Sequence, residues 1–438
     1  MFALLNQALK RLVQTGQLSV TDIRGRKYVY GDGTGKPAGF KVVNARAPMK
    51  IVLDPDRFLG EAYMDGEIEL TEGTIYDLLE VLLTNVEQRP SPGASKFFNQ
   101  LRIAMKRLDQ YNPVGKAKSN VAHHYDLSGA LYELFLDRDR QYSCAYFEAP
   151  DASLEDAQLA KKRHLAAKLN IKPGMKVLDI GSGWGGLGLY LAETCGAKVT
   201  GVTLSEEQHK MSIERARQRS VSNTVDFRLL DYRLLDEPFD RIVSVGMFEH
   251  VGVGHYREFF GKCRALLKDD GIAVLHSINR SDGPGATSAW TKKYIFPGGY
   301  IPALSEVLPS IEKSGLVVND IEILRLHYAD TLKNWRARFL ANRDKAKALY
   351  DERFCRMWDF YLAGSEAAFR WQDLMVFQIQ LTRKNDTLPV TRGYIEKTEK
   401  ALALHGSAHE PELKADKVKA DRPKAKKAPA KRKVEKKA

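Results

Sequence analysis

The stretch from Val177 to Gly186 limits what this chain can fold into more than any other part of the sequence. An apolar run ends in Asp179, meets a cluster of glycines and continues into a helical apolar pattern that Gly196 stops. We therefore expect a strand, a tight turn and a helix. Glycines let the backbone approach a ligand closely, and the start of a helix presents unpaired N–H groups. A glycine turn alone is weak evidence for a ligand, because such turns often only reverse the chain.

The next predicted strand, 198–204, narrows the choice of ligand. A dinucleotide site of the usual kind has Asp or Glu about twenty residues after the turn, where it binds the ribose 2′-hydroxyl. This chain has the neutral residues Thr203, Leu204 and Ser205 there. The pattern disfavours a dehydrogenase and favours a nucleoside cofactor without a pyrophosphate, such as S-adenosylmethionine.

Strand and helix patterns alternate from Met175 onward, which predicts an α/β fold with a mostly parallel sheet and helices on both faces. The last strand follows a long helical stretch, 328–374, that we expect to form a lid over the ligand crevice. Ligands bind beyond the carboxyl ends of the strands in such sheets. We expect strands at 177–180, 198–204, 225–229, 239–247, 271–278, 317–324 and 376–382.

The first 92 residues are predicted to form a small α+β domain. An amphipathic helix at 2–13 is followed by short strands at 27–30, 40–43 and 49–53 and by an apolar helix at 74–85. A linker and a basic helix at 93–122 lead to the second domain, 123–396. We find no catalytic constellation in the N-terminal domain.

The last segment, 397–438, is predicted to be a disordered tail rich in Lys, Ala and Pro. Between Lys414 and Lys437, twelve basic residues outnumber three acidic ones, and this excess is most of the net charge of +13. A segment with so few apolar residues cannot bury a core. Two interpretations stay open: a solubilising tail, or an electrostatic arm for anionic lipid headgroups, to which each basic residue contributes on the order of 1 kcal/mol. The tail alone does not separate lipid from nucleic acid, but we expect no nucleic-acid partner.

Four widely spaced cysteines, without a C-x-x-C pair or a nearby His cluster, predict neither a disulfide scaffold nor a metal site and fit a reducing cytoplasm. No apolar run approaches the roughly 18 residues that span a bilayer. Lys10 and Arg11 interrupt the first apolar stretch, so we expect no signal peptide. We therefore expect a cytoplasmic protein that associates peripherally with the inner face of the membrane.

Five motifs lie at the predicted strand ends and in the segments around them. They are Tyr142-Ser143-Cys144, the glycine turn with Trp184, Thr203-Leu204-Ser205 with Gln208, the segment 247–252 and the segment 293–299. Together they resemble the cyclopropane-fatty-acyl-phospholipid synthase family, which includes the mycolic acid cyclopropane synthases. The resemblance implies a Rossmann-like class I methyltransferase sheet and a lipid-binding N-terminal domain. It also implies methyl transfer from S-adenosylmethionine to the cis double bond of an acyl chain, followed by proton loss that closes a ring.

The resemblance covers about 123–383 and can be carried over residue by residue. The positions that match the family's cofactor site are Tyr142, Ser143, Gly181, Gly183, Gly185, Thr203, Leu204, Gln208 and Tyr232. Asp179 and Asp231 join them because each closes a strand on the ligand side. The positions that match the family's bicarbonate site are Cys144, Glu249, His276, the backbone at Ile278, and Tyr328.

The chemistry explains these residue types. An alkene is a weak nucleophile, so methyl transfer creates carbocation character, and water must be kept out while a base takes a proton. A bicarbonate ion needs hydrogen-bond donors, which His276, Tyr328 and the Cys144 thiol supply, and an acceptor for its own hydroxyl, which Glu249 supplies. A carboxylate held in this way can act as a positioned base, and the ring face of Tyr328 can steady the cation.

Each of these residues also has a purely structural interpretation. Gln208 ends Ser205-Glu206-Glu207-Gln208, a capping box that starts a helix without any ligand, and Asp231 is of a type that commonly stabilises loops. Cys144 alone is most often a small buried hydrophobe. His276 alone is often a core histidine, and Glu249 alone often caps a helix.

One position departs from the family's pattern. Relatives often carry a cysteine, once treated as catalytic, on the lid helix, whereas the matching segment 363–370 of this chain has Ser365. A thiol base at that site is therefore disfavoured, and Cys355 lies ten residues earlier and does not replace it. The bicarbonate mechanism does not depend on this position.

The expected function is cyclopropanation of unsaturated acyl chains in membrane phospholipids. The alternatives are a relative that methylates the chain without closing a ring, a small-amine N-methyltransferase, and a non-catalytic lipid-binding protein. The set of Cys144, Glu249, His276 and Tyr328 favours an alkene, because an amine is already nucleophilic. The resemblance alone suggests a homodimer.

Overall fold

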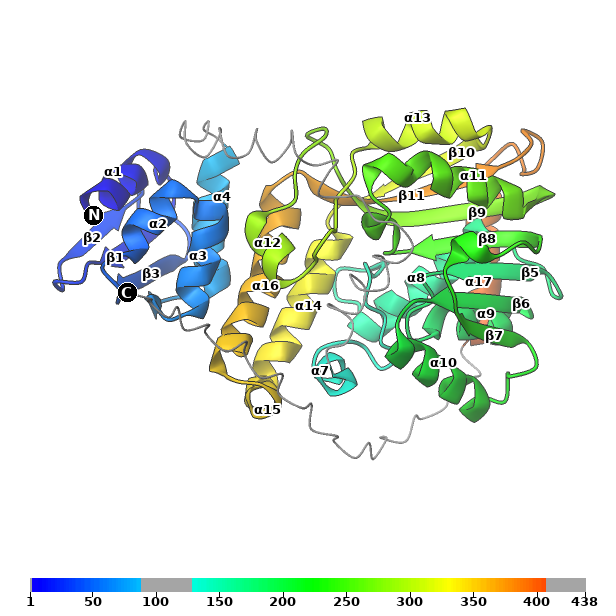
Figure 1. The fold of residues 1–438 in the computed structure, drawn as a ribbon, viewed down its shortest axis with the longest axis horizontal. Helices are drawn as coiled ribbons and strands as arrows, with labels where there is room; N and C mark the ends of the chain where they lie inside the picture. Colours follow the sequence, from blue (N-terminus) through cyan, green and yellow to red (C-terminus); the bar gives the residue numbers. More distant parts are fainter. Residues whose placement is uncertain (1, 88–127, 407–438) are drawn as a thin grey trace, which may run out of the picture.

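The computed structural model describes residues 2–87 and 128–406. Figure 1 shows three parts in a row: a small N-terminal unit, a group of long helices beside it, and a twisted sheet covered by further helices. Within the described ranges, no helix combines the length and the apolar composition needed to cross a bilayer.

The N-terminal unit is a four-stranded sheet with helices packed against it. Its elements are α1 (Phe2–Leu12), β1 (Gln17–Thr21), β2 (Lys27–Tyr30), β3 (Pro37–Val42), α2 (Ala47–Leu53), α3 (Pro55–Met64), β4 (Ile68–Glu72) and α4 (Ile75–Glu87). The strand order is β2-β1-β3-β4, in which β1 pairs antiparallel with β2 and parallel with β3. Buried residues such as Leu9, Phe40 and Leu78 join the helices to the sheet.

The strand predicted at 49–53 is wrong, because these residues lie in helix α2. This helix has Pro48 in its first turn and buries Ala47 and Ile51 at helical spacing. A proline suits the first turn, where its missing N–H needs no partner, and a short apolar run does not by itself distinguish a strand from a helix. Helix α3 begins at Pro55 in the same manner and has no counterpart among the predicted elements.

The second sheet contains β5 (Lys176–Ile180), β6 (Lys198–Thr203), β7 (Val225–Leu229), β8 (Phe239–Val245), β9 (Leu267–Arg280), β10 (Val317–Leu324) and β11 (Leu374–Thr382). Their order is β10-β11-β9-β8-β5-β6-β7. The five strands from β9 to β7 are parallel neighbours, and β11 runs antiparallel to both β9 and β10. The predicted α/β fold with a mostly parallel sheet is confirmed.

Helices cover both faces of this sheet, as a parallel sheet requires. On one face, α8 (Leu154–Lys168), α9 (Gly186–Cys195) and α17 (Gly393–Gly406) pack through residues such as Leu165 and Leu189. On the other face, α11 (Tyr256–Leu266) and α13 (Leu304–Ser314) pack through Phe260 and Ile311. Helix α10 (Glu206–Gln218) packs beside β7 at the sheet edge.

The stretch predicted as a lid is helical. It consists of α14 (His327–Ala341), α15 (Arg343–Leu349) and α16 (Glu352–Trp371), which together connect β10 to β11. Helix α16 also packs against α3 and α4, so the lid lies between the N-terminal unit and the sheet (Figure 1). At this contact the Tyr63 hydroxyl donates a buried hydrogen bond of 3.0 Å to Asp359.

Helix α17 corrects the predicted start of the tail at residue 397. The helix runs to Gly406, buries Ile395, and places Glu399 Oε1 at 2.5 Å from Nδ1 of His164 on α8. The lysine-rich composition begins only at Lys414, so the predicted boundary cuts through this last helix. The predicted linker and basic helix at 93–122, and the tail beyond residue 406, lie outside the described residues.

Candidate active site

A pocket lies at the carboxyl ends of β5, β6 and β8, where the parallel strands end, and the segment 140–143 forms a further wall. Ten of the residues predicted to hold the cofactor line it: Tyr142, Ser143, Asp179, Gly181, Gly183, Thr203, Leu204, Gln208, Asp231 and Tyr232. Gly185 does not line the pocket. It caps α9 at φ +82° and faces Phe227 and Ser212.

The glycine turn leaves backbone bare beside the pocket. Gly183 has φ +54°, and a Cβ at this position would meet no atom within 4 Å. A ligand can therefore approach the main chain closely at Gly183. Helix α9 begins three residues later, and its first N–H groups have no intrahelical acceptors. The turn is thus built to receive polar ligand groups.

Asp179 places a carboxyl group without a hydrogen-bond partner in the pocket wall. The residue is 2% exposed, and its Oδ2 atom has no partner among the described residues. Burial raises the pKa of Asp179 to about 7, although the positive charge of Lys161 opposes the shift. An unpartnered buried carboxylate oxygen is costly, so this position is suited to a polar or cationic ligand group.

Gln208 serves the helix and the pocket at once. The Ser205 hydroxyl accepts a hydrogen bond from the Gln208 backbone N–H at 3.3 Å, so Ser205 caps the helix, but the predicted capping box is incomplete because the Ser205 N–H donates to the Thr203 hydroxyl and not to the Gln208 side chain. The Gln208 side chain lines the pocket and accepts a bond of 2.9 Å from the Thr203 hydroxyl. Thr203 and Gln208 thereby hold each other at the pocket wall.

Asp231 is engaged with its own loop. Its carboxylate accepts from the backbone N–H of Arg233 at 3.0 Å and from the guanidinium of Arg233 at 2.9 and 2.7 Å. The loop-stabilising interpretation of Asp231 is therefore correct, and contact with a cofactor stays a prediction. Its neighbour Tyr232 packs edge-on against Phe259 with ring centroids 5.6 Å apart.

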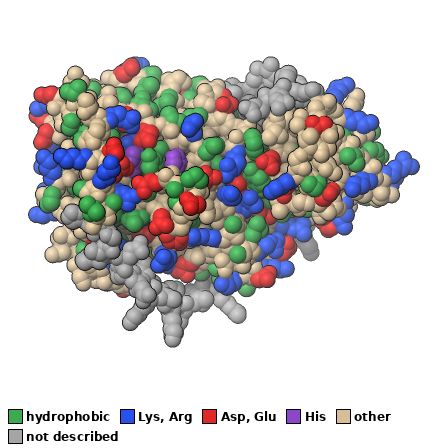
Figure 2. Space-filling model, turned by 180° about the vertical axis from the view of Figure 1, so that it is seen from behind, with side chains coloured by type: hydrophobic (Ala, Val, Ile, Leu, Met, Phe, Trp, Pro, Cys, Tyr) green, Lys and Arg blue, Asp and Glu red, His purple; other side chains and the backbone are tan. Residues whose placement is uncertain are grey.

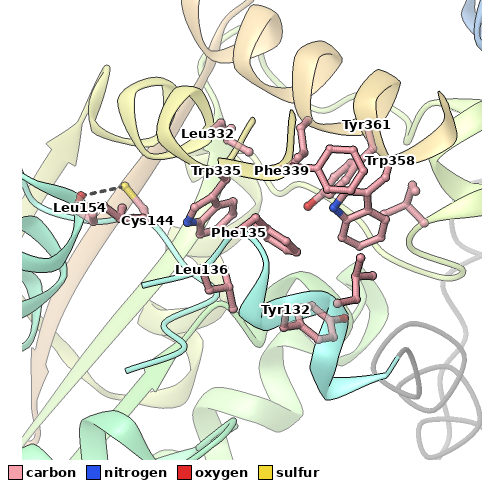
Figure 3. Packing of buried hydrophobic residues seen from close by; sticks show 14 of the residues in the cluster. Tyr132, Phe135, Leu136, Cys144, Leu154, Leu332, Trp335, Phe339, Trp358 and Tyr361 are labelled. Atoms are coloured by element: carbon pink, nitrogen blue, oxygen red, sulfur yellow. Dashed lines mark hydrogen bonds between the residues drawn. The ribbon is translucent and has the colours of Figure 1, made fainter. Parts of the chain in front are cut away.

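Tyr142 connects the pocket to a cluster of aromatic side chains beneath the lid. Its hydroxyl lies 2.7 Å from that of Tyr361 on α16, and its ring stacks on Trp335 of α14 with centroids 5.2 Å apart. Figure 3 shows that side chains from the lid helices point toward Tyr132 and Phe135, which lie in and just after α7 (Gly129–Glu133). This buried apolar region excludes water next to the pocket.

The residues predicted to hold bicarbonate lie behind the pocket wall, and none of them lines the pocket. Two of them meet directly, because Oε1 of Glu249 accepts a hydrogen bond of 2.7 Å from the backbone N–H of Ile278. The other oxygen, Oε2, is buried and accepts no hydrogen bond of good geometry from the described residues, although the Ser277 hydroxyl is close enough to lower the pKa of this carboxyl. Burial raises the pKa of Glu249, although the hydrogen bond from Ile278 opposes the shift.

Three further members of this set surround the same region. Cys144 is fully buried in the apolar cluster that Ile278 and Tyr328 also contact, and burial raises the pKa of its thiol. His276 lies on β9, two residues before Ile278, and its Nδ1 is 3.2 Å from the amide of Gln378 on β11. Burial, reinforced by the charge of Lys161, lowers the pKa of His276, so its ring is neutral.

Several pocket residues are not among those predicted to hold the cofactor. His250 and His255 line it from the segment after β8, and Gln141 lines it beside Tyr142. Burial lowers the pKa of His250 to about 4. The rule that ligands bind at strand ends already pointed to His250, whereas nothing in the sequence distinguishes Gln141 from other polar loop residues. Within the described residues, no group of three His, Cys, Asp or Glu side chains is placed to hold a metal ion.

Two families match this chain. The family described as mycolic acid cyclopropane synthetase matches residues 114–379, more than half of the chain. A domain of unknown function (DUF7884) matches residues 4–89, which correspond closely to the N-terminal unit.

Individual relatives extend this result. The cyclopropane-fatty-acyl-phospholipid synthase of Escherichia coli strain K12 is 39% identical over 348 residues, which make up 79% of this chain and 88% of that protein. A probable fatty acid methyltransferase of Pseudomonas putida is 40% identical over 326 residues, which make up 71% of this chain and 78% of the relative.

The solved structure of mycolic acid cyclopropane synthase CmaA1 complexed with SAH and CTAB is 35% identical to this chain. It aligns with a TM-score of 0.58 and covers 62% of this chain and 99% of that one. The resemblance found in the motifs is confirmed. From the glycine turn, the order of the strands and these matches, the chain belongs to the mycolic acid cyclopropane synthetase family of S-adenosylmethionine-dependent methyltransferases.

Proposed function

We propose that the chain forms cyclopropane fatty acids by methylene transfer from S-adenosylmethionine to the cis double bond of unsaturated acyl chains in membrane phospholipids, with bound bicarbonate as the proton acceptor. The observation that carries this proposal is the buried Oε2 of Glu249, which lies behind the cofactor pocket and accepts no hydrogen bond of good geometry from the described residues. Such a carboxylate could also serve an amine substrate, so it is the full set of Cys144, Glu249, His276 and Tyr328 that favours an alkene.

The cofactor pocket fits S-adenosylmethionine, which would supply the methyl group. Asp179 offers an acceptor for a ligand ammonium, and the bare backbone at Gly183 permits close approach. Tyr142 and Ser143 also line the pocket. The chain's own contribution is to orient the cofactor and to keep water away from the reacting carbon.

The aromatic cluster beneath the lid would hold the acyl chain. Trp335, Tyr142 and Tyr328 lie edge to face or stacked, with Tyr328 and Trp335 centroids 5.8 Å apart. Such ring faces are attracted to positive charge. They would stabilise the cationic carbon that forms when the double bond accepts the methyl group, and the apolar surroundings would prevent its hydration.

Ring closure requires that the added carbon lose a proton to a base. A bicarbonate ion held behind the pocket would supply that base, and Oε2 of Glu249 would accept the hydrogen bond from its hydroxyl. The neutral ring of His276 would act as a donor to it, and the protonated thiol of Cys144, which donates to the Ala145 carbonyl oxygen at 3.3 Å in this structure, would turn to donate to it as well. Ser365 lies half-buried on α16. It carries a hydroxyl and no thiol, so a thiol base is not available at this position.

The test is mass spectrometry of lipids from a host that lacks cyclopropane fatty acids and expresses this chain. We expect a gain of one CH₂ on monounsaturated chains, with ring-specific fragmentation. The Glu249→Gln variant should lose most of this product while still binding S-adenosylhomocysteine, because it keeps the shape but not the charge of the carboxylate. Glu312→Gln, on the exposed side of α13, is the matched control.

A second function, methylation without ring closure, is supported by the similarity to the probable fatty acid methyltransferase of P. putida. The product would have the same mass, and its fragmentation would reveal a branched alkene instead of a ring. No change in lipid mass, with cofactor bound and lipid supplied, would sink the acyl-chain proposal and favour a small-amine substrate. Cofactor binding without turnover of either substrate would favour a lipid-binding protein.

We infer further that the chain works at the anionic inner face of the membrane, on the cytoplasmic side. The turn between β1 and β2 exposes Ile23 beside Arg24 and Arg26. In Figure 2, Lys and Arg side chains gather at the end formed by the N-terminal unit, whereas over the rest of the visible face they alternate with Asp and Glu. An exposed apolar residue among basic ones suits a surface of anionic headgroups. A homodimer is suggested by the family resemblance alone.

A further inference from the structure

Two almost fully buried polar side chains of helix α8 form hydrogen bonds to the wall of the cofactor pocket. Nζ of Lys161 donates to Oε1 of Gln141 at 2.6 Å and to Oγ of Ser143 at 2.8 Å. One turn earlier, Nε2 of Gln158 donates to the backbone oxygens of Ser143 at 2.9 Å and Gln141 at 3.3 Å. Lys161 and Gln158 are 0% and 1% exposed, so no water competes for these bonds.

The segment that they hold is in a conformation that it would not favour alone. Arg140 has φ +56°, a left-handed value that non-glycine residues rarely adopt. Asp137 shapes the same turn by accepting from the backbone N–H of Gln141 at 2.8 Å. Gln141, Tyr142 and Ser143 all line the pocket. Their position against a ligand therefore depends on the two side chains from α8.

Lys161 also acts on the pocket through its charge. Burial lowers the pKa of Lys161 to about 8, against the attraction of Asp137 and Asp139, so the amine stays charged at neutral pH. This charge favours the ionised form of Asp179, whose pKa burial raises. The neighbouring Lys162 is paired with Asp139 at 2.7 Å and is not among the groups that act on Asp179.

Other charged and titratable groups also lie near Lys161 and interact with it. Lys162 repels its charge, and Cys144 is close enough for the two groups to interact. His276 interacts with Lys161 as well and is kept neutral. The Lys161 ammonium thus contacts the wall of the cofactor pocket and acts electrostatically on Asp179 in the pocket and on His276 behind it.

We propose that Lys161 is a positioning residue of the cofactor site, which holds Gln141 and Ser143 at the pocket wall and places a buried positive charge behind that wall. The inference rests on the proposed function, because it assumes that the pocket binds S-adenosylmethionine or its demethylated product. Lys161 does not line the pocket and acts only through its neighbours.

The test measures S-adenosylhomocysteine binding by calorimetry between about pH 5.5 and 8, below and around the range in which an α-amino group loses its proton. Wild-type chain, Lys161→Met and Lys161→Arg are compared, with Arg163→Met as the control on the same helix, because Arg163 pairs with Glu148 and not with the groups around Lys161. We expect Lys161→Met to bind at least tenfold more weakly at pH 7 and to shift the acid midpoint of binding upward by about one pH unit. Lys161→Arg should restore the midpoint, and Arg163→Met should not move it.

The outcomes distinguish a failure of the proposed cofactor site from a failure of the role assigned to Lys161. If wild-type chain binds no S-adenosylhomocysteine at any pH, the cofactor site itself is overturned. If wild type binds and Lys161→Met keeps the wild-type midpoint, only the assignment of Lys161 is overturned. Should Lys161→Met fail to fold by circular dichroism, Lys161→Gln takes its place, since an amide can still donate to Ser143 but carries no charge. With Lys161→Gln the midpoint should rise as for Met, and an unmoved midpoint overturns the assignment.

Discussion

Asp179 shows how a single side chain can make ligand binding depend on pH. Its pKa of about 7 in the free protein means that the carboxyl is half protonated near neutrality. A cationic ligand binds the ionised form, so binding must expel a proton at lower pH. We expect the dissociation constant for S-adenosylhomocysteine to rise about tenfold for each pH unit below about 6.5 and to level off above about 7.5.

The Asp179→Asn variant checks this expectation. It should bind roughly tenfold or more weakly at pH 7.5, since a hydrogen bond to a charged group contributes about 1.5–3 kcal/mol. The variant should also lose the dependence on pH below 7 that wild type has, because an amide does not titrate. Calorimetric titrations of both proteins give the two curves. A parallel pH profile in the variant would show that another group is responsible.

Individual residues also show where motif reasoning reaches its limit. The family resemblance predicts that Gln208 contacts the cofactor, while its place in the first helical turn has a structural explanation. In the structure the Gln208 backbone N–H bonds to the capping Ser205, and the residue also lines the pocket. Lys161 lies within a helical pattern that looks like any basic surface helix. Only the packing of α8 against the segment 141–143 makes its amine part of the site.

The glycine turn between β5 and α9 is the element on which the pocket depends most. A Cβ at Gly185 would lie 2.6 Å from Cζ of Phe227 and 3.0 Å from Cβ of Ser212, at a backbone φ of +82°. We expect Gly185→Ala to lower the free energy of unfolding by about 2–4 kcal/mol, from the strained φ together with the overpacking. Urea denaturation monitored by circular dichroism measures this loss.

Gly261→Ala is the control for that substitution. Gly261 lies within α11 and is exposed, and a Cβ added there would meet no atom within 4 Å. Alanine there should be neutral or stabilise by up to about 1 kcal/mol, because it favours the helix. Equal effects of the two substitutions would mean that the close approach of Phe227 does not constrain the turn.

Elements differ in how well their patterns predict them. The parallel strands are recognisable because a strand buried on both faces is an almost continuous apolar run. The segment 49–53 has the same appearance and is helical, because Pro48 begins a helix there and Ile51 is buried on one side of it. Which of the two forms a short apolar run adopts depends on what packs against it.

For the whole molecule, the charge of the C-terminal segment is a separate question from the fold. Removal of residues 407–438 takes away the stretch in which twelve basic residues outnumber three acidic ones. If that stretch is an electrostatic arm, the truncated chain should bind vesicles rich in anionic lipid at least tenfold more weakly at low salt, since each basic residue near the surface contributes on the order of 1 kcal/mol. Cosedimentation measures this change.

Vesicles of neutral phosphatidylcholine are the control, and both chains should bind them equally. Wild-type binding to the anionic vesicles should fall as salt rises, because salt screens such contacts. Equal binding of both chains to anionic vesicles would leave the solubilising interpretation. Activity on detergent-dispersed lipid should be unchanged, because the pocket and the lid lie within residues 128–406.

The chain's local patterns were sufficient for the sheet, the glycine turn, the helical stretch before the last strand and the strand ends at which the pocket lies. These features follow from hydrophobic periodicity and from the few residue types that tight turns allow, which are properties of neighbouring positions. Three other features depend on tertiary structure. They are the docking of the lid against both the N-terminal unit and the sheet, the hydrogen bond between Glu249 and Ile278, and the hydrogen bonds of Lys161 to the pocket wall. They join residues that are far apart in the chain. Their free energies depend on burial and on the exclusion of water, and a local sequence pattern gives no information about either.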